Sequence, residues 1–511
     1  MRRIGLILFV GIFILFISLP YILAAASAGD SHVFGGFLIN PIDGNSYLAK
    51  MEIGRQGNWL FQLPYTADVG EGVFLFLFYI FLGHLSAWSG IEPVLIFHLA
   101  RVCGAIFLLL VLWRFIEQIL SGYDRQVRIG ALLLVSFGSG LGWVAVFFGG
   151  FTSDFWVAEA YPFLSSYANP HFPIGIAIML NYFRILTNPK AGIKPIWVAL
   201  QGILLAVIMP FGVVVAGIVA VIYTGLKWSI ERKFIWQHLV WFFVLGGMLL
   251  AYQYWIILRD PLLNAWNRQN VTTSPPLGDI ILSFSPALIL AGYGFIGFLK
   301  NKLSPNLLLP AVWLISGLLL AYFPFSLQRR FLLGYFIPVS LFGVVGLWQL
   351  ARTRVNPFRR LFAVVILLSI VTNIIIVSGG IIASSKKDLN VYLFNSERDA
   401  FHWIEEQRLP GSLVLASVRS GLLIPAYTNW RVLYGHPFET VDAYQRENEI
   451  ERIFRGKYSE QEIQSYIRQK RIDFVLLGPL DRETNSWRFL RRFPLVFQNE
   501  GVRIYSVREK E

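Results

Sequence analysis

The sequence is poor in charged side chains and almost devoid of cysteine. Charged residues make up 15% of the 511 residues, against about 25% in an ordinary soluble domain. A deficit of this size excludes a soluble or a disordered chain. The single cysteine, Cys103, excludes an internal disulfide framework and a cysteine-based zinc cluster. Apolar side chains are abundant instead: 55% of the residues are hydrophobic and 16% aromatic, which is typical of a polytopic membrane protein.

The basic residues are distributed as membrane loops require. Residues 385–511 hold 20 Lys and Arg against 18 Asp and Glu, whereas the first 384 residues hold 24 against 13. The basic excess therefore lies between the apolar segments, where the positive-inside rule places it. This location argues against nucleic acid as a partner.

Eleven apolar segments are predicted to span a membrane, which takes about 20 residues per helix. They are 4–26, 93–120, 129–150, 171–187, 195–208, 210–226, 235–258, 280–299, 306–323, 331–350 and 361–383. The first is predicted to stay uncleaved, because its uncharged run exceeds the core of about 7–15 residues typical of a signal peptide. A cleaved leader is the alternative. Met209-Pro210 is the one helix break that the sequence reveals, because proline interrupts a helix. Residues 195–226 are therefore predicted to form two short spans or a re-entrant hairpin.

The short apolar segment 73–88 sets the predicted orientation of the chain. If it lies in the interface, the inner loops hold 15 Lys and Arg in 41 residues and the outer loops hold six in 114. This asymmetry places the N-terminus inside and the C-terminal part outside. The predicted fold class is a mainly α polytopic membrane bundle of about 11 spans, residues 1–384, with a first external loop at 27–92. A small extracytoplasmic α/β domain, residues 385–511, follows it.

The C-terminal segment has the composition of a soluble α/β domain. Strands are predicted at 413–416, 432–434, 474–477, 495–497 and 503–507, and helices near 396–407, 439–453 and 459–471. His436 follows a strand end in Gly435-His436-Pro437, where α/β domains bind ligands. It is a candidate to contact a substrate or to close the site, and a turn histidine bonded to backbone is the alternative. The segment lacks a phosphate-cradling glycine motif, which argues against a nucleotide donor.

The first outer loop contains a candidate catalytic base, Asp43. Pro41 and Gly44 predict a turn around it, and the spacing from Ser46 onward suits a short amphipathic helix on the membrane surface. A carboxylate fixed above the bilayer can accept a proton from an acceptor hydroxyl. The alternative is that Asp43 caps the helix that follows.

The second outer loop, 151–170, contributes Asp154 and Glu159 and has no basic residue. Either acid is a candidate second catalytic carboxylate, and Glu159 together with Asp43 is a candidate pair for a divalent metal ion. His171 follows Asn-Pro at the lip of the next span and is a candidate to bind a sugar or a phosphate. Loop solvation and helix capping are the alternatives. No pair has the spacing of a recognised metal motif, so no cofactor is certain.

Three arginines depart from the charge rule. Arg329 and Arg330 lie together at the outer end of a span, where a phosphate is a suitable partner for a forked guanidinium. Snorkelling toward lipid head groups is the alternative. Arg101 lies about two turns into the second span, where an ionisable residue usually has a partner inside the bundle. It is predicted to bind phosphate or to form a structural tie with Glu92.

These motifs resemble the GT-C glycosyltransferases, including enzymes of the protein-O-mannosyltransferase and aminoarabinose-transferase type. The resemblance lies in the order of an N-terminal span, an external loop with Asp43 followed by Tyr47-Leu48-Ala49, and an interfacial apolar segment. Gln328-Arg329-Arg330-Phe331 is similar to a stretch of related bacterial membrane transferases. Gly44 stands where the family usually has a second acid.

The resemblance implies an inverting glycosyltransferase in the cytoplasmic (inner) membrane. Asp43 would be the base, Tyr47 would help to bind the substrate, and the donor would be a sugar on a polyprenyl phosphate. The acceptor would be the hydroxyl of a lipid, a glycan or a protein at the outer face. Asp43 is then expected to share one chamber with Arg329 and Arg330.

Three other functions remain open at this point, and one of them is a non-catalytic scaffold with a periplasmic binding domain. A transporter or flippase of lipid-linked sugars would show an inverted repeat with matching broken helices, and the sequence has one break and no visible repeat. An oligosaccharide ligase or polymerase would use the same chemistry with larger donors.

Overall fold

The computed structural model describes residues 3–188, 194–232, 236–300, 303–352, 358–407, 409–481 and 485–508. The chain forms two compact units. The helical unit comprises Met1–Pro20, His98–Tyr252 and Thr272–Ile382, and the mixed unit comprises Tyr21–Phe97, Gln253–Val271 and Ala383–Glu511. The mixed unit therefore groups most of the predicted first outer loop with the segment that follows Ala383.

The structure confirms a mostly helical, multi-pass membrane protein. Six helical stretches of the described residues are long and apolar enough to cross a membrane: α1 (Arg3–Ala26), α4 (Pro93–Ile119), Arg125–Val146, α10 (Pro210–Glu231), α11 (Trp236–Arg259) and α17 (Phe358–Ser385). Four apolar helical stretches are shorter: α3 (Leu77–Ser89), α9 (Pro195–Ile208), Pro305–Ala321 and α16 (Phe336–Arg352). The count of eleven spans stays a prediction, because several of these helices rise less than the bilayer core of about 30 Å.

One predicted span, 280–299, is not a continuous helix. The structure divides it into α13 (Leu277–Phe284) and α14 (Ala287–Leu299), which meet at 89° and make a seventh span only if the pair crosses as one. Pro286 explains the bend, since proline lacks an N–H donor and disfavours a helical residue before it. The sequence analysis missed this break. The other break, Met209-Pro210, separates α9 from α10 as predicted.

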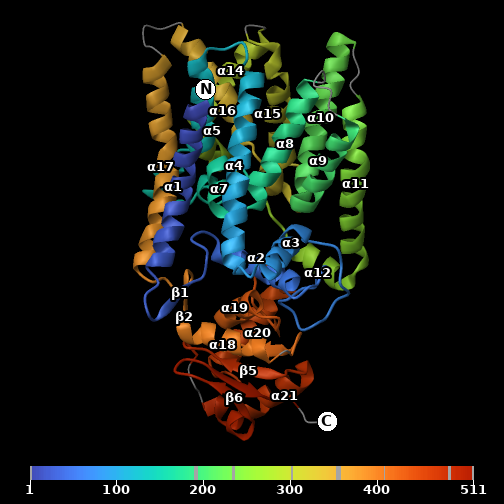
Figure 1. The fold of residues 1–511 in the computed structure, drawn as a ribbon, viewed down its shortest axis with the longest axis vertical. Coiled ribbons are helices and arrows are strands. Elements are labelled where there is room, and N and C mark those ends of the chain that lie inside the picture. Colours follow the sequence, from blue (N-terminus) through green and yellow to red (C-terminus); the bar gives the residue numbers. More distant parts are fainter. Residues whose placement is uncertain are drawn as a thin grey trace. The chain divides into compact units, whose positions relative to one another are not determined.

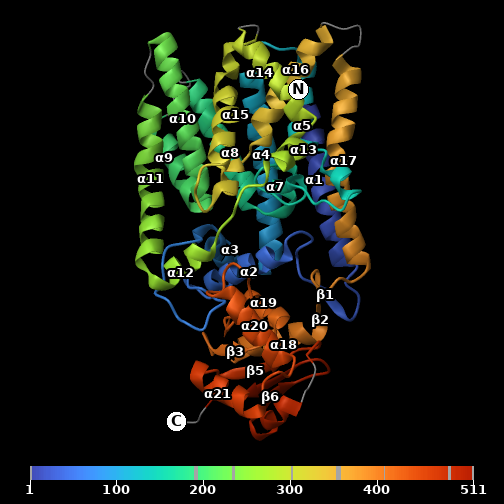
Figure 2. The ribbon, with the colours of Figure 1, turned by 180° about the vertical axis from the view of Figure 1, so that it is seen from behind.

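Helices of the helical unit lie side by side, as both ribbon views show (Figure 1, Figure 2). Small residues permit the closest approach, which is how membrane helices pack without a hydrophobic force between them. A Cβ atom on Gly346 of α16 would lie 2.2 Å from the carbonyl oxygen of Leu290 in α14. The backbones of α14 and α16 are therefore in direct contact.

The mixed unit contains a five-stranded sheet in the order β4-β3-β5-β7-β6. Its strands are β3 (Leu413–Leu415), β4 (Arg431–Val432), β5 (Phe474–Leu477), β6 (Leu495–Gln498) and β7 (Arg503–Ser506). β3 runs parallel to β4 and β5, and β7 runs antiparallel to β5 and β6. Three helices lie close to their predicted positions: α18 (Asn395–Glu406), α20 (Ala443–Phe454) and α21 (Glu460–Lys470). A further helix, α19 (Val418–Tyr427), was not predicted.

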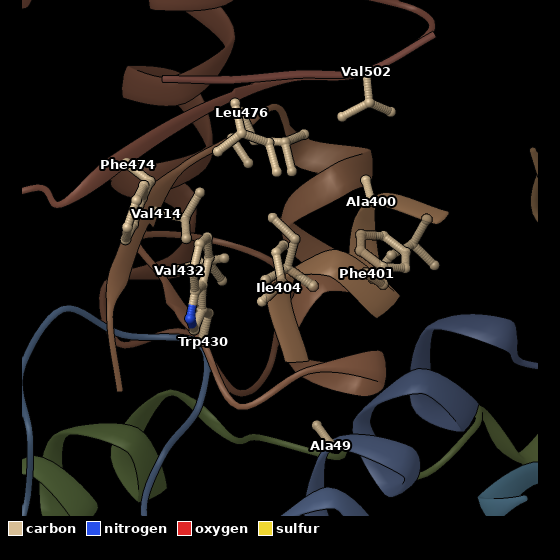
Figure 3. Close-up of a cluster of buried hydrophobic side chains, with 14 of the residues drawn as sticks. Ala49, Ala400, Phe401, Ile404, Val414, Trp430, Val432, Phe474, Leu476 and Val502 are labelled. Carbon is tan, nitrogen blue, oxygen red and sulfur yellow. The ribbon is translucent and has the colours of Figure 1, made fainter. Parts of the chain in front are cut away.

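Alternation along the strands gives the sheet an apolar core on each face. Val414 of β3 faces one core, while its neighbours Leu413 and Leu415 face the other. Figure 3 shows the first core, in which Trp430 is stacked on Phe474 with ring centroids 4.3 Å apart. Ala49 of the first outer loop belongs to the same core, so the helix that carries it packs against the C-terminal sheet and its helices.

A second sheet connects the same two segments. β1 (His32–Phe34) pairs antiparallel with β2 (Tyr392–Phe394), with Val33 opposite Leu393. Backbone hydrogen bonds thus tie the start of the first outer loop to the residues that follow α17.

Replacing Trp430 with alanine should destabilise the mixed unit by about 3–5 kcal/mol, because the change leaves a cavity in a closed core. Thermal unfolding of the purified protein in detergent measures the effect. Tyr444→Ala is the control, since Tyr444 is 83% exposed. Equal melting temperatures for the two variants would contradict the assignment of Trp430 to the core.

Candidate active site

Asp43 lies in the first turn of α2 (Pro41–Arg55). The predicted turn around Pro41 and Gly44 is helical instead, because proline's fixed φ suits the first helical position and Asn40 adopts a left-handed conformation just before it. Asn40, rather than Asp43, occupies the N-cap position. A carboxylate in the first turn is favoured by the helix dipole.

Tyr47 follows one turn later on α2, and its ring stacks on Tyr79 of α3 at 4.4 Å and 9°. α2 and α3 approach so closely that a Cβ atom on Gly54 would lie 1.9 Å from the carbonyl oxygen of Ile80. This backbone contact fixes the position of α2 against α3.

Asp43 and His436 meet in the mixed unit. The Asp43 side chain is 43% exposed, and its Oδ1 lies 3.5 Å from Nε2 of His436, which is 2% exposed. Nδ1 of His436 accepts a hydrogen bond of 3.1 Å from the backbone N–H of Phe438, so the proton of the neutral ring sits on Nε2 and faces Asp43. Since 3.5 Å exceeds a normal hydrogen bond, the contact is electrostatic. The hydrogen bond between the His436 ring and the backbone, which the alternative interpretation of this residue predicted, is therefore present together with the contact to Asp43.

An ion pair lies beside this contact, in which Lys50 is fully buried and the Glu439 side chain is 12% exposed. Lys50 Nζ donates to Glu439 Oε1 at 2.5 Å and to Ser46 Oγ at 2.6 Å, and the Ser46 hydroxyl donates to the same Glu439 oxygen. Burial by itself raises the pKa of Glu439, but the charge of Lys50, then the electrostatic contribution of the His436 ring, and the hydrogen bonds from Lys50 and Ser46 hold the pKa below its usual value. The aromatic ring of Phe76 lies 4.6 Å from the Lys50 ammonium.

Sequence reasoning missed Lys50, Ser46 and Glu439. The spacing of Ser46 and Lys50 by one helical turn is a visible signal, and Glu439 closely follows His436. The pairing itself joins residues 389 positions apart, and nothing in a single sequence reveals such a contact.

Glu159, Arg329 and Arg330 meet in the helical unit. Glu159 is buried and accepts hydrogen bonds on Oε1 from Arg329 Nε at 3.3 Å and from Arg330 Nη1 at 3.4 Å. The arginine side chains are 20% and 28% exposed. The Arg329 guanidinium lies 4.8 Å from the ring centre of Trp156. One carboxylate thus faces two cations, and the group keeps a net positive charge.

Asp154 is fully buried among hydrogen-bond donors. Its Oδ2 accepts from the backbone N–H groups of Gly140 and Gly142, both at 3.2 Å, and from Thr372 Oγ1 at 2.9 Å. Its Oδ1 accepts from Thr152 Oγ1 at 2.7 Å. These hydrogen bonds hold the loop before Gly142 in place, although burial outweighs them and raises the pKa of Asp154 above its usual value.

Arg101 is buried within α4 and bonds to backbone. Its Nη1 donates to the carbonyl oxygens of Ile17 in α1, at 3.3 Å, and of Ser166 in α7 (Pro162–Ala168), at 3.1 Å, while Nε contacts His98. These bonds tie three helices together. His171 begins α8 (His171–Thr187), is 9% exposed and lies against the neighbouring ring of Phe172.

The described residues contain no group of three or more His, Cys, Asp or Glu that could hold a metal ion. Asp43 and Glu159 belong to different units, so a metal shared between them stays a prediction.

The comparisons with known proteins bear on the fold. No protein-family model matches the chain, and no curated protein matches it. Similar solved structures include the apo oligosaccharyltransferase of Archaeoglobus fulgidus, with a TM-score of 0.56 at 12% identity over 93% of this chain and 70% of that one. Arabinofuranosyltransferase AftD from Mycobacteria has a TM-score of 0.53 at 13% identity, and the match covers all of this chain but 40% of AftD.

The archaeal enzyme AglB was also solved with an inhibitory peptide and a dolichol-phosphate, and that structure gives a TM-score of 0.52 at 12% identity over 93% and 69% of the two chains. These proteins are GT-C glycosyltransferases. The chain has the GT-C fold. The resemblance drawn from Asp43, Tyr47 and the first span is thereby confirmed at the level of the fold. The GT-C fold alone assigns no reaction, and the site residues stay predictions.

Asp154→Asn should lower stability by about 2–4 kcal/mol, because an amide nitrogen would face donors that now bind a charged oxygen. The melting temperature of the purified protein measures the loss. Asp124→Asn serves as the control, since Asp124 is exposed at the start of α5 (Arg125–Phe137). If Asp154→Asn has the same melting temperature as the wild type, the hydrogen bonds around Asp154 contribute little to the stability of the protein.

Proposed function

We propose that the protein is an inverting glycosyltransferase that moves a sugar from a polyprenyl-phosphate donor to an acceptor hydroxyl at the outer face of the cytoplasmic membrane. The GT-C fold supports this proposal, because the solved structures that share it are glycosyltransferases and one of them holds a dolichol-phosphate. The acceptor is a lipid, a glycan or a protein.

The observation that carries the proposal is the exposure of Asp43. The other two candidate acids, Asp154 and Glu159, are buried and bonded to donors of the chain itself. Asp43 keeps 43% of its side chain exposed and can therefore receive a proton from a bound hydroxyl. A base must be reachable by its substrate, and this condition selects Asp43.

In the proposed reaction the acceptor hydroxyl loses its proton to Asp43 as its oxygen attacks the anomeric carbon. The bond from that carbon to the phosphate oxygen breaks on the opposite side, and the polyprenyl phosphate leaves with the bonding electrons. Attack opposite the leaving group inverts the anomeric configuration. His436 Nε2 faces Asp43 Oδ1 at 3.5 Å, and 43% of the Asp43 side chain stays exposed to a bound acceptor.

Arg329 and Arg330 are proposed to bind the phosphate of the donor. Negative charge grows on that phosphate as the bond breaks, so fixed positive charge lowers the barrier. Glu159 neutralises one of the two cations, and the remaining charge matches an anionic lipid head group. Forked guanidinium groups suit phosphate oxygens.

Asp43→Asn should keep the fold and lower turnover by about 10²–10⁴-fold, because the amide cannot accept the proton. The assay follows release of polyprenyl phosphate from radiolabelled polyprenyl-phosphate monosaccharides by the protein in nanodiscs. Asp68→Asn is the matched control, since Asp68 is an exposed acid of the same outer loop. Turnover of Asp43→Asn equal to the control would remove Asp43 as the base.

Arg329→Gln/Arg330→Gln should weaken binding of polyprenyl phosphate at least about tenfold, because charged hydrogen bonds contribute about 1.5–3 kcal/mol each. Binding of the labelled lipid at two salt concentrations measures the loss. Arg268→Gln is the control, because Arg268 is a basic residue of a predicted outer loop and bonds to Asn264. Unchanged lipid binding in the double variant would exclude this phosphate site.

Transfer of a whole oligosaccharide is the second candidate, favoured by the fold similarity to oligosaccharyltransferases. A donor panel containing both single sugars and oligosaccharides on polyprenyl carriers separates the two reactions.

A further inference from the structure

The loop of residues 435–442 in the mixed unit is held by two helices, α2 and α12 (Pro261–Gln269). α2 binds it through Lys50 and Ser46, which both contact Glu439. From α12, the Gln269 amide donates to the carbonyl oxygen of Thr440 and accepts from the backbone N–H of Asp442. These contacts come from segments that are remote in the sequence, so the position of the loop is strongly determined.

Further hydrogen bonds, within the loop and from Asn270, fix the backbone of residues 435–440. The hydroxyl oxygen of Thr440 accepts hydrogen bonds from the backbone N–H groups of Gly435 and His436, both at 3.3 Å. Asn270 donates to the carbonyl oxygen of Phe438 at 3.0 Å. The ring of His436 is therefore fixed at its backbone and at Nδ1.

Two buried polar atoms of this loop are left without a hydrogen bond in the described part of the chain. They are Nε2 of His436 and Oε2 of Glu439. A buried polar atom without a partner costs about 1–3 kcal/mol, and such atoms call for an explanation. Nε2 of His436 lies 3.5 Å from the exposed carboxylate of Asp43, and Glu439 is bound by Ser46 and Lys50 of the helix that carries Asp43. Their placement indicates a function that stability alone does not supply.

The ion pair fixes the rotation of α2 as well as its distance from the loop. Lys50 lies about two turns after Asp43, so the two side chains share a face of the helix. The aromatic rings of Phe76, Tyr47 and Phe61 lie 4.6, 5.6 and 5.9 Å from the Lys50 ammonium. With Lys50 enclosed in this way, α2 cannot turn without breaking a buried charge pair.

We propose that Glu439 is a positioning residue of the active site: by binding Lys50 and Ser46 it holds Asp43 of α2 in register with Nε2 of His436. The inference rests on the proposed function of Asp43 as the base. A displacement of about 1 Å at a reacting group lowers the rate by about 10²-fold, so a buried bond remote from the substrate can control turnover.

The test removes both charges at once, because Glu439→Gln alone would leave Lys50 buried and unpaired. Lys50→Met/Glu439→Gln should keep the melting temperature close to that of the wild type while kcat for release of polyprenyl phosphate falls at least about tenfold. The KM for the donor should stay unchanged. Adding His436→Asn to this variant should reduce kcat much less than it does in the wild type, because both changes disturb one arrangement. A kcat equal to the wild type, or fully multiplicative effects, would overturn the proposal.

A matched control changes another ion pair of the same unit. Arg446→Met/Glu449→Gln removes a partly buried pair on α20, and kcat should stay within about twofold of the wild type. Glu439→Asp keeps the charge, so it tests the proposal even if the double variant at Lys50 fails to fold. It should lower kcat with little change in melting temperature, and an unchanged kcat in a folded protein would overturn the proposal.

A readout that needs no substrate separates this inference from the proposed function. Hydrogen–deuterium exchange at the ring carbon of His436, followed by mass spectrometry, should be several-fold faster in Lys50→Met/Glu439→Gln than in the wild type or the α20 control. Equal exchange rates would overturn the positioning role. If the wild type releases no polyprenyl phosphate from any donor, the proposed function fails, and the exchange rates still show whether the pair positions His436.

Discussion

The buried ion pair between Lys50 and Glu439 joins two segments that lie 389 residues apart in the chain. Removing two charges from water is costly, and the pair persists because Ser46 and the surrounding aromatic rings complete its contacts. Such a pair contributes less to stability than to the choice of one arrangement. Here the arrangement includes the depth and rotation of α2, and both bear on where the carboxylate of Asp43 is presented.

The acidic side chains of the two units differ in their exposure and in their hydrogen-bond partners. In the helical unit, Asp154 receives backbone and hydroxyl donors and Glu159 receives two guanidinium groups. In the mixed unit, Glu439 is largely enclosed, with 12% of its side chain exposed, whereas Asp43 stays 43% exposed. Enclosure fixes a carboxylate against its donors, and exposure leaves it accessible to a substrate hydroxyl. The proposed distinction between structural acids and a catalytic acid rests on these surroundings rather than on residue type.

Much of the architecture was predictable because it depends on local signals. Short apolar runs separated by polar and helical stretches indicated the five strands, and Met209-Pro210 indicated the break between α9 and α10. The helix around Asp43 was placed a few residues late, because Pro41 was interpreted as part of a turn rather than as a first helical residue. The bend at Pro286 was missed, since a long apolar run concealed it.

The candidate site was predictable only in part. Asp43, His436, Glu159 and the two arginines were each singled out by position or by an unusual charge, and the structure brings them into two separate groups. The sequence alone could not predict which residues contact α2, the helix that carries Asp43. Lys50 looked like an ordinary basic residue of a loop, and its burial depends on Glu439 and on aromatic rings of other segments.

The pairing of β1 with β2 has a consequence for how the protein is made. Strand β1 emerges from the ribosome early, yet its partner at Tyr392–Phe394 is synthesised only after α17. The same delay applies to Lys50, which must wait for Glu439. Throughout most of translation the segment bearing Asp43 therefore has an unpaired strand edge and an unmatched cation. The segment around Asp43 therefore completes its pairing only after α17, β2 and the residues around Glu439 have been synthesised, so a chain truncated before β2 lacks both partners of this segment.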